Sequence, residues 1–261
     1  MMKPELGSPV KHLLVDLDGT LLANRAFPLS FDFMNRALGV LRKYGGVKKG
    51  ASVLYEIYRE FGRPSLDKAN DVRVVELFSR RMNLSIEEAR RVLREGISLI
   101  FPSLEKHFYP VPGSKDFLDW AKDHYPLTLA TNPVWPPEIA EMRVKWAGID
   151  PSIFGFITHV RAMHAVKPHP EYYQEILDKQ ELSAENCLLI GDSEKMDLPA
   201  TRIGIRVFIV DSKPASKKTQ AKEAPKLTIL KPAKALASAW KGSYADLRAL
   251  LEAQLSTPSS R

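Results

Sequence analysis

Short apolar runs alternate with amphipathic segments along most of the chain. Five runs have the length of strands, at residues 12–16, 127–131, 154–158, 187–191 and 206–210. Between the later runs the spacing of apolar positions predicts helices, over residues 113–125, 136–148, 169–180 and 196–204. Strands that alternate with helices form parallel sheets covered by helices on both faces. The pattern therefore predicts an α/β fold with a doubly wound parallel sheet.

The interval from residue 24 to residue 109 lacks this alternation. Its apolar positions have helical spacing, and no segment reads convincingly as a strand. Ser85 and Glu88 have the spacing of a capping box and predict the start of a helix. We therefore expect residues 24–109 to be an inserted all-helical cap domain. Residues 1–23 and 110–261 then form the core domain.

Charge is distributed unevenly. The 261-residue chain has a net charge of +7, and residues 213–241 alone hold eight lysines and one glutamate. The rest of the chain is balanced, with 30 basic and 30 acidic side chains. A segment rich in Lys, Ala, Pro and Ser is typical of a solvated loop or insertion, which we expect for residues 213–241. We do not expect nucleic acid as a partner, because a basic run alone indicates it only weakly.

Cysteine use and hydropathy predict a cytoplasmic protein. Cys187 is the single cysteine and stands in an apolar run. We therefore expect it to be a small buried residue of a protein in a reducing compartment. The N-terminal residues form no apolar leader, and no run approaches the roughly 18 apolar residues of a membrane span. We expect no membrane partner, and the sequence does not indicate an oligomeric state.

Polar residues follow three of the predicted strands. Asp16 ends the first apolar run, Thr131 ends the second, and Asp192 follows the run over residues 187–191. Ligands of open parallel sheets bind at the carboxyl ends of the strands, so we expect these three side chains at one rim. Each could instead be a turn or capping residue, which is the more frequent use of Asp and Thr at strand ends.

Four sequence blocks resemble those of the haloacid dehalogenase-like (HAD) hydrolase superfamily. They are DLDGT at residues 16–20, TN at 131–132, Lys167 in VKPHPEYY, and GDSEKMD at 191–197. Each block alone is a weak signal, but the four occur in order and in the context of predicted strands. The chain is similar in particular to members with a helical cap inserted after the first strand. The resemblance implies a Rossmann-like core with a cap over its site.

The resemblance also implies phosphoryl transfer through a covalent intermediate on Asp16. A carboxylate can attack phosphorus and form an aspartyl-phosphate, provided that its negative charge is offset. The family pattern implies that Mg²⁺ supplies this offset. Its ligands would be Asp16, the backbone carbonyl of Asp18 and the carboxylate of Asp192.

Further residues of the four blocks would bind the phosphoryl group. Thr131 and the backbone of Asn132 would donate hydrogen bonds to its oxygens. Lys167 would offset its charge and orient the nucleophile. Asp197 would lie beside the metal ligands or hold Lys167. The resemblance thus implies a site that binds a small phosphorylated metabolite.

Asp18 bears on the choice between chemistries. A phosphate ester needs a proton for its leaving oxygen, and an aspartate two residues after the nucleophile can supply it. The dehalogenases of the superfamily do not need this acid, and its ATP-driven pumps lack it. We therefore expect Mg²⁺-dependent hydrolysis of a small phosphate monoester, with Asp16, Asp18, Thr131 and Lys167 as catalytic residues.

Other functions remain open. A phosphomutase of the same superfamily would use the same residues. Phosphonate cleavage would need a cap amine, for which Lys43, Lys48 and Lys49 are candidates. A non-catalytic binding protein would use the lysine-rich segment. The substrate itself would be selected by cap residues that the sequence does not single out, and Trp135 either lines the entrance to the site or packs against the helix that follows it.

Overall fold

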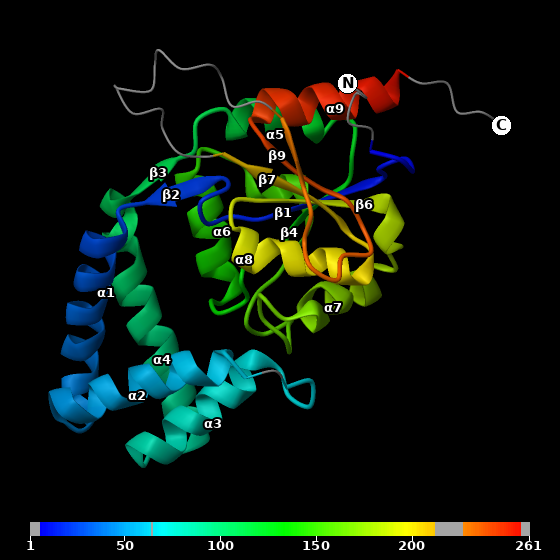
Figure 1. The fold of residues 1–261 in the computed structure, drawn as a ribbon. Helices are drawn as coiled ribbons and strands as arrows, with labels where there is room; N and C mark the ends of the chain where they lie inside the picture. The colour runs from blue at the N-terminus through cyan, green and yellow to red at the C-terminus, as the bar shows by residue number, and fades with distance from the viewer. Residues whose placement is uncertain (1–5, 64, 212–226, 257–261) are drawn as a thin grey trace.

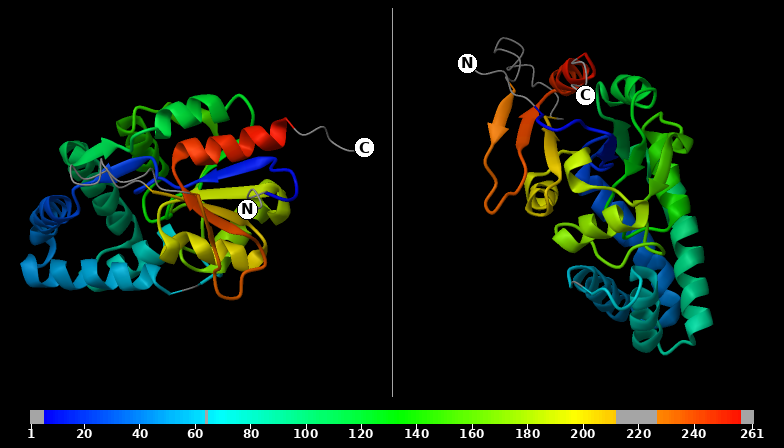
Figure 2. Two further views of the ribbon diagram at one scale, coloured as in Figure 1. Left: turned by 45° about the horizontal axis from the view of Figure 1, so that its top comes forward. Right: turned by 90° about the vertical axis from the view of Figure 1, so that its right-hand side faces the viewer.

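A central sheet organises the chain. The computed structural model describes residues 6–63, 65–211 and 227–256, and within them the sheet has seven strands in the order β5-β4-β1-β6-β7-β9-β8. Helices cover both faces of the sheet, and the helices of residues 26–100 lie to one side of it (Figure 1). The views in Figure 2 show the same two groups of helices. No helix in these residues is both long and apolar enough to cross a bilayer.

The five predicted strands form the parallel part of the sheet. They are β1 (His12–Val15), β4 (Leu127–Leu129), β5 (Phe154–Ile157), β6 (Cys187–Gly191) and β7 (Arg206–Val210). β1 pairs in parallel with β4 on one side and with β6 on the other. The chain adds β4 and β5 on one side of β1 and then β6 and β7 on the other side. The carboxyl ends of β4, β1 and β6 therefore lie together at the point where the strand order reverses, which is where open α/β sheets bind ligands.

Successive side chains of the central strands enter opposite layers of the core. Leu13 and Val15 of β1 pack in the layer that contains residues of α5, α6 and α9, whereas Leu14 packs in the layer with α7. Because both faces are buried, the strands read as continuous apolar runs and do not alternate. The helices of this part are α5 (Ser114–Ala121), α6 (Pro137–Trp146), α7 (Pro170–Gln180), α8 (Glu194–Asp197) and α9 (Tyr244–Leu255). A 3-10 helix, Leu198–Ile203, continues from α8.

Residues 26–107, called the helical segment below, lie between two short paired strands. β2 (Leu22–Asn24) and β3 (Phe108–Pro110) form a separate two-stranded antiparallel sheet, so the helical segment begins and ends at one place. The predicted capping box is present before α4: Ser85 Oγ accepts from the Glu88 N–H at 3.2 Å, and Glu88 Oε2 accepts from the Ser85 N–H at 2.9 Å. The helices of this segment are α1 (Ala26–Leu41), α2 (Gly46–Phe61), α3 (Asn70–Met82) and α4 (Ile86–Ile100), followed by the 3-10 helix Phe101–His107.

Four strands were not predicted from the sequence. Besides β2 and β3, these are β8 (Thr228–Leu230) and β9 (Ala239–Gly242). β9 is parallel to β7, and β8 pairs antiparallel with β9 at the edge of the sheet. The prediction of a loop over residues 213–241 is therefore wrong at β8 and at the start of β9, whereas residues 231–238 between them form no helix or strand and residues 212–226 lie outside the described part. Strands of three or four residues that are separated by Lys and Pro have too short a pattern to be recognised.

Candidate active site

The carboxylate of Asp16, directly after β1, is buried and held by two donors. Lys167 Nζ donates to Asp16 Oδ1 at 2.7 Å, and Thr20 Oγ1 donates to Asp16 Oδ2 at 3.2 Å. The side chains of Asp16 and Lys167 are 8% and 2% exposed. A buried carboxylate depends on such partners because water cannot reach it. The two bonds fix its orientation at the rim of the sheet.

Lys167 lies in the loop before α7, and its ammonium joins two carboxylates. Besides Asp16, it donates to Asp197 Oδ1 at 2.7 Å. The backbone N–H of Lys167 donates to Asn132 Oδ1 at 3.2 Å, so the Asn132 side chain helps to place this loop. Burial alone would lower the pKa of Lys167, but the two carboxylates raise it well above its ordinary value. The site therefore contains a permanent positive charge.

Two glycines make room for two carboxylates. A Cβ on Gly19 would lie 2.1 Å from Asp192 Oδ2, and a Cβ on Gly191 would lie 2.2 Å from Asp197 Oδ2. Gly19 also has a φ of +79°, which favours glycine. The glycine of DLDGT is thus needed both for its turn and for the close approach of Asp192.

The carboxylates of Asp16, Asp192 and Asp197 form a cluster suited to a divalent cation. One oxygen of each lies within 4.8 Å of the others. An all-oxygen set of this kind fits Mg²⁺, which is bound in proteins through one or two carboxylates with waters. Asp197 also accepts from the Ser193 N–H at 3.1 Å, so each of its carboxyl oxygens has a protein partner, as each carboxyl oxygen of Asp16 does. The predicted metal ligands Asp16 and Asp192 both belong to this cluster, and the predicted contribution of Asp18 is its backbone carbonyl.

The carboxylates of the cluster have raised pKa values, as is typical of a site with excess negative charge. Burial raises the pKa of Asp16 to about 7, although Lys167 opposes this shift. Burial and then repulsion by Asp197 raise the pKa of Asp192 to about 6. A cation bound between these groups would offset both effects.

Thr131, after β4, has a hydroxyl that is free to bind a ligand. Thr131 Oγ1 is buried and has no hydrogen-bond partner among the residues that the structure describes. The backbone carbonyl of Thr131 accepts from Tyr172 at 2.8 Å and from Thr158 at 2.6 Å, so the backbone is fixed while the hydroxyl is not used. A buried unpaired hydroxyl is costly unless a bound molecule satisfies it.

Asp18 differs from the other site carboxylates because it pairs with an arginine that the sequence did not single out. Asp18 Oδ1 accepts from Nη2 of Arg143 on α6. The side chain of Asp18 is 45% exposed, whereas that of Arg143 is 4% exposed. Arg143 lies on the buried face of α6 with Ile139 and Val144, which indicates burial, but Asp18 is 125 positions away, so no local pattern reveals the pair.

A tyrosine from the end of the chain supports the nucleophile loop. Tyr244, the first residue of α9, donates from its hydroxyl to the Thr20 carbonyl at 2.7 Å. Thr20 in turn donates to Asp16. Burial raises the pKa of Tyr244, so this hydroxyl remains a donor. The sequence carries no signal for this contact, because it joins residues 224 positions apart.

The helical segment contacts several loops at the rim of the sheet. Trp135, in the loop after Thr131, packs edge-on against Phe33 of α1 at 5.7 Å and against Phe101 at 4.6 Å between ring centroids. Further along, the N–H groups of Asn70 and Asp71 at the start of α3 donate to the carbonyls of Met163 and Val160. Figure 1 shows the helical segment beside the end of the sheet where β2 and β3 lie. These contacts hold the helical segment next to the candidate site.

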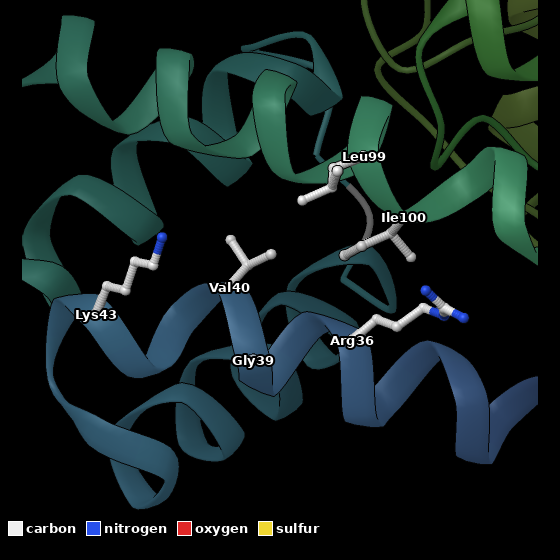
Figure 3. A pocket seen from close by; sticks show the side chains of 6 residues that line it. All are labelled: Arg36, Gly39, Val40, Lys43, Leu99 and Ile100. Atoms are coloured by element: carbon white, nitrogen blue, oxygen red, sulfur yellow. The ribbon is translucent and has the colours of Figure 1, made fainter.

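An open hollow of about 240 Å³ lies on the surface of the helical segment, between α1 and α4. Figure 3 shows Val40 and Ile100 near its middle, with Lys43 and Arg36 toward opposite ends. No carboxylate of the cluster lines it. Lys43, one of the lysines considered for phosphonate cleavage, belongs to this hollow.

These features define an α/β protein with an acidic, lysine-containing site at the switch point of its sheet. The family model of haloacid dehalogenase-like hydrolases matches residues 10–202, and the chain belongs to this family. No curated protein matches the chain.

Several solved structures share the fold. A 2-haloacid dehalogenase from Pseudomonas syringae pv. tomato DC3000 is 18% identical, with 94% of this chain and 99% of that chain covered and a TM-score of 0.59. A HAD phosphatase from Thermococcus onnurineus is 19% identical, with 93% and 98% covered and a TM-score of 0.55. The HAD-hydrolase YfnB from Bacillus subtilis, in a magnesium-bound form, is 18% identical, with 94% and 99% covered and a TM-score of 0.50.

Proposed function

We propose that the protein hydrolyses a small phosphate monoester in a Mg²⁺-dependent reaction through an aspartyl-phosphate on Asp16. The pair of aspartates after β1 carries this proposal. Asp16 is buried and held at both oxygens, as suits a nucleophile, whereas Asp18 is 45% exposed beside it, as suits an acid that meets a leaving group. Expulsion of a halide would leave the second carboxylate without a use.

In the first half of the reaction, Asp16 attacks phosphorus while the phosphoryl oxygens are bound. A carboxylate oxygen of Asp16 forms a bond to phosphorus, and the ester P–O bond breaks with its electron pair going to the leaving oxygen. Asp18 gives that oxygen a proton. The free hydroxyl of Thr131 and the backbone N–H of Asn132 donate to phosphoryl oxygens, and Lys167 offsets their charge.

In the second half, water releases the phosphate. Asp18 accepts a proton from the water that attacks phosphorus, and the bond between phosphorus and Asp16 breaks with its electron pair returning to the carboxylate. Asp197 keeps Lys167 against Asp16 throughout, through the 2.7 Å bond between them. Asp16 and Asp192, with the backbone carbonyl of Asp18, would hold Mg²⁺, which offsets the repulsion between a carboxylate nucleophile and a phosphate.

We assign residues 24–109 as the cap domain that selects the substrate. The contacts of Trp135 with Phe33 and Phe101 support this assignment, because they place the helical segment beside the loop of Thr131. A cap in this position excludes water and suits a small phosphorylated metabolite better than a large substrate.

The proposed location is the cytoplasm. Cys187 is buried in β6, and burial raises the pKa of its thiol to about 11. A thiol that stays protonated and inaccessible is a packing residue, as expected in a reducing compartment.

A panel of phosphate monoesters and 2-haloacids, assayed with and without Mg²⁺, tests the proposal. We expect phosphate release from at least one ester, only with Mg²⁺, and none from Asp16→Asn. Asp18→Asn should lower kcat by about 100-fold or more with a small change in KM. Asp178→Asn, an exposed carboxylate on α7, is the matched control and should have no effect.

Two further observations separate the alternatives. Acid quenching during turnover should trap a phosphorylated wild-type enzyme and no phosphorylated Asp16→Asn. Transfer of the phosphoryl group to an isomeric ester, without release of phosphate, would indicate a phosphomutase. Wild-type rates in Asp16→Asn, or dehalogenation with no ester hydrolysis, would overturn the proposal.

A further inference from the structure

Arg143 is a buried cation that the proposed reaction does not yet use. It lies in the last turn of α6 with its side chain 4% exposed, and its Nη2 donates to Asp18 Oδ1. Its Nε is buried and has no hydrogen-bond partner in the described part of the chain. A guanidinium in this environment has lost most of its hydration, which is costly. The ion pair with Asp18 compensates for part of this cost.

The guanidinium of Arg143 has little freedom to move. It lies over the ring of Phe108 in β3, with 5.7 Å from its central carbon to the ring centroid. Trp146, also on α6, packs on the same ring at 5.1 Å between centroids. The next residue of the helix, Val144, is fully buried in the core. Because Arg143 is fixed by this packing, it determines where the Oδ1 atom of Asp18 lies.

The backbone of Asp18 is fixed independently of Arg143. Asp18 forms a β-bridge with Leu22, and the Gly19 N–H donates to the Leu22 carbonyl at 2.9 Å. Only the side-chain torsions of Asp18 are then free, and a single partner is enough to select one orientation. With Oδ1 bound to Arg143, Oδ2 has no hydrogen bond to any residue that the structure describes, and it is the oxygen left for a leaving group.

We propose that Arg143 is a positioning residue for Asp18. It holds the Asp18 carboxyl with Oδ2 free, so that a proton passes between Oδ2 and the leaving oxygen of the ester. Arg143 does not touch the substrate and acts only through Asp18. The inference rests on the proposed function, because it concerns the leaving group of a phosphate ester.

The dependence of the rate on the leaving group tests this role. An alkoxide needs a proton as it leaves, whereas a nitrophenolate is stable without one. We therefore compare kcat/KM for an alkyl phosphate and for nitrophenyl phosphate at saturating Mg²⁺, because kcat/KM covers the steps up to departure of the alcohol. Arg143→Met should lower the value for the alkyl ester about tenfold more than for the nitrophenyl ester, as an acid out of position does.

Three other variants complete the experiment. Asp18→Asn should show the same preference for the nitrophenyl ester, and Arg143→Met/Asp18→Asn should be no worse than Asp18→Asn, because both changes remove one function. Arg143→Lys should show a smaller shift of the same sign, since an ammonium lacks the planar fork of a guanidinium. The control is Arg161→Met, which should change kcat/KM for neither ester. Arg161 is exposed and pairs at 2.7 Å with Glu138, which lies on α6 as Arg143 does.

The outcomes separate this inference from the proposed function. Equal losses on both esters in Arg143→Met, or additive losses in the double variant, mean that Arg143 serves folding alone and overturn the inference while ester hydrolysis stands. If Arg143→Met does not fold, Arg143→Lys decides, and an unchanged ratio of the two esters counts against the inference. If the wild type hydrolyses neither ester nor any other in the panel, the proposed function fails instead.

Discussion

Substitution of Gly19 by alanine perturbs the candidate site in a way that can be divided into two effects. The first is backbone strain, because Gly19 has a φ of +79°. The second is a collision, because the new Cβ would lie 2.1 Å from Asp192 Oδ2. Gly46, at the start of α2, has a φ of +80°, and a Cβ added there would meet no atom within 4 Å, so Gly46→Ala has the strain without the collision.

The two effects differ in their expected size and in what they change. A left-handed conformation costs a residue with a Cβ about 1–2 kcal/mol, so both variants should lose about that much free energy of unfolding. Ordinary contacts of a Cβ begin near 3.4 Å, so the Asp192 carboxylate in Gly19→Ala must withdraw by more than 1 Å. A displacement of about 1 Å in a site of this kind costs about 100-fold in rate. Mg²⁺ binding should weaken too, because Mg²⁺ demands near-ideal geometry.

Calorimetric titration with Mg²⁺ and denaturant unfolding measure the two effects separately. Gly19→Ala and Gly46→Ala should be destabilised alike, and only Gly19→Ala should bind Mg²⁺ more weakly and lose activity. In an Asp192→Ala background, Gly19→Ala should have no further effect on Mg²⁺ binding, because the colliding carboxylate is absent. Normal Mg²⁺ binding by Gly19→Ala, or equal losses in Gly46→Ala, would refute the reasoning.

Three further predictions concern the lysine, the helical segment and pH. Asp197→Asn removes one of the two charges that hold Lys167 and should lower kcat about tenfold or more with little change in KM, measured by steady-state kinetics. Phe33→Leu removes an edge-to-face contact with Trp135 and should lower the free energy of unfolding by about 1–2 kcal/mol in denaturant titration. Burial lowers the pKa of His12 below 6.5, so the unfolded state binds the proton more readily than the folded state does. The free energy of unfolding therefore falls as pH drops below 6.5. His12→Asn should remove up to about 1.4 kcal/mol per pH unit of this dependence.

Each of these predictions has a matched control. Glu194→Gln changes an exposed carboxylate on the same short helix as Asp197 and should leave kcat unchanged. Phe31→Leu alters a ring on α1 that is 64% exposed and should cost little stability. For His12 the control is the range above about pH 7.5, where the wild type and His12→Asn should show the same dependence of stability on pH. A control that behaves like its partner would contradict the corresponding explanation.

The sheet could be predicted from the sequence where burial is two-sided. All five residues of β6 are buried, and its sequence is a continuous apolar run, which is typical of a strand buried on both faces and not of a loop. β2 and β3 could not be predicted, because each has three residues and is defined by its pairing partner. The same holds for β8, which is mostly exposed and lies at the edge of the sheet. Such strands are products of tertiary pairing, which a local pattern does not contain.

The gathering of site residues could be anticipated for a related reason. Asp16, Thr131 and Asp192 follow neighbouring parallel strands, and parallel strands end at one rim. The pairing of Arg143 could not be anticipated: its position on the buried face of α6, beside Ile139 and Val144, indicates burial but does not identify Asp18 as its partner. Tyr244 is a similar case, since its hydroxyl bond to Thr20 depends on how α9 packs on the sheet.

The stretch from Thr131 to Trp146 connects the site with the helical segment, although the sequence drew attention only to its first two residues and to Trp135. Thr131 offers its free hydroxyl to a ligand, and Asn132 holds the backbone of Lys167. Trp135 packs against rings of the helical segment, whereas Arg143 and Trp146 share the ring at the start of β3. Arg143 is also the partner of the candidate acid. Phe108, the ring against which Arg143 packs, directly follows His107, the last residue of the helical segment. The partner of the candidate acid therefore packs at the junction between the helical segment and β3.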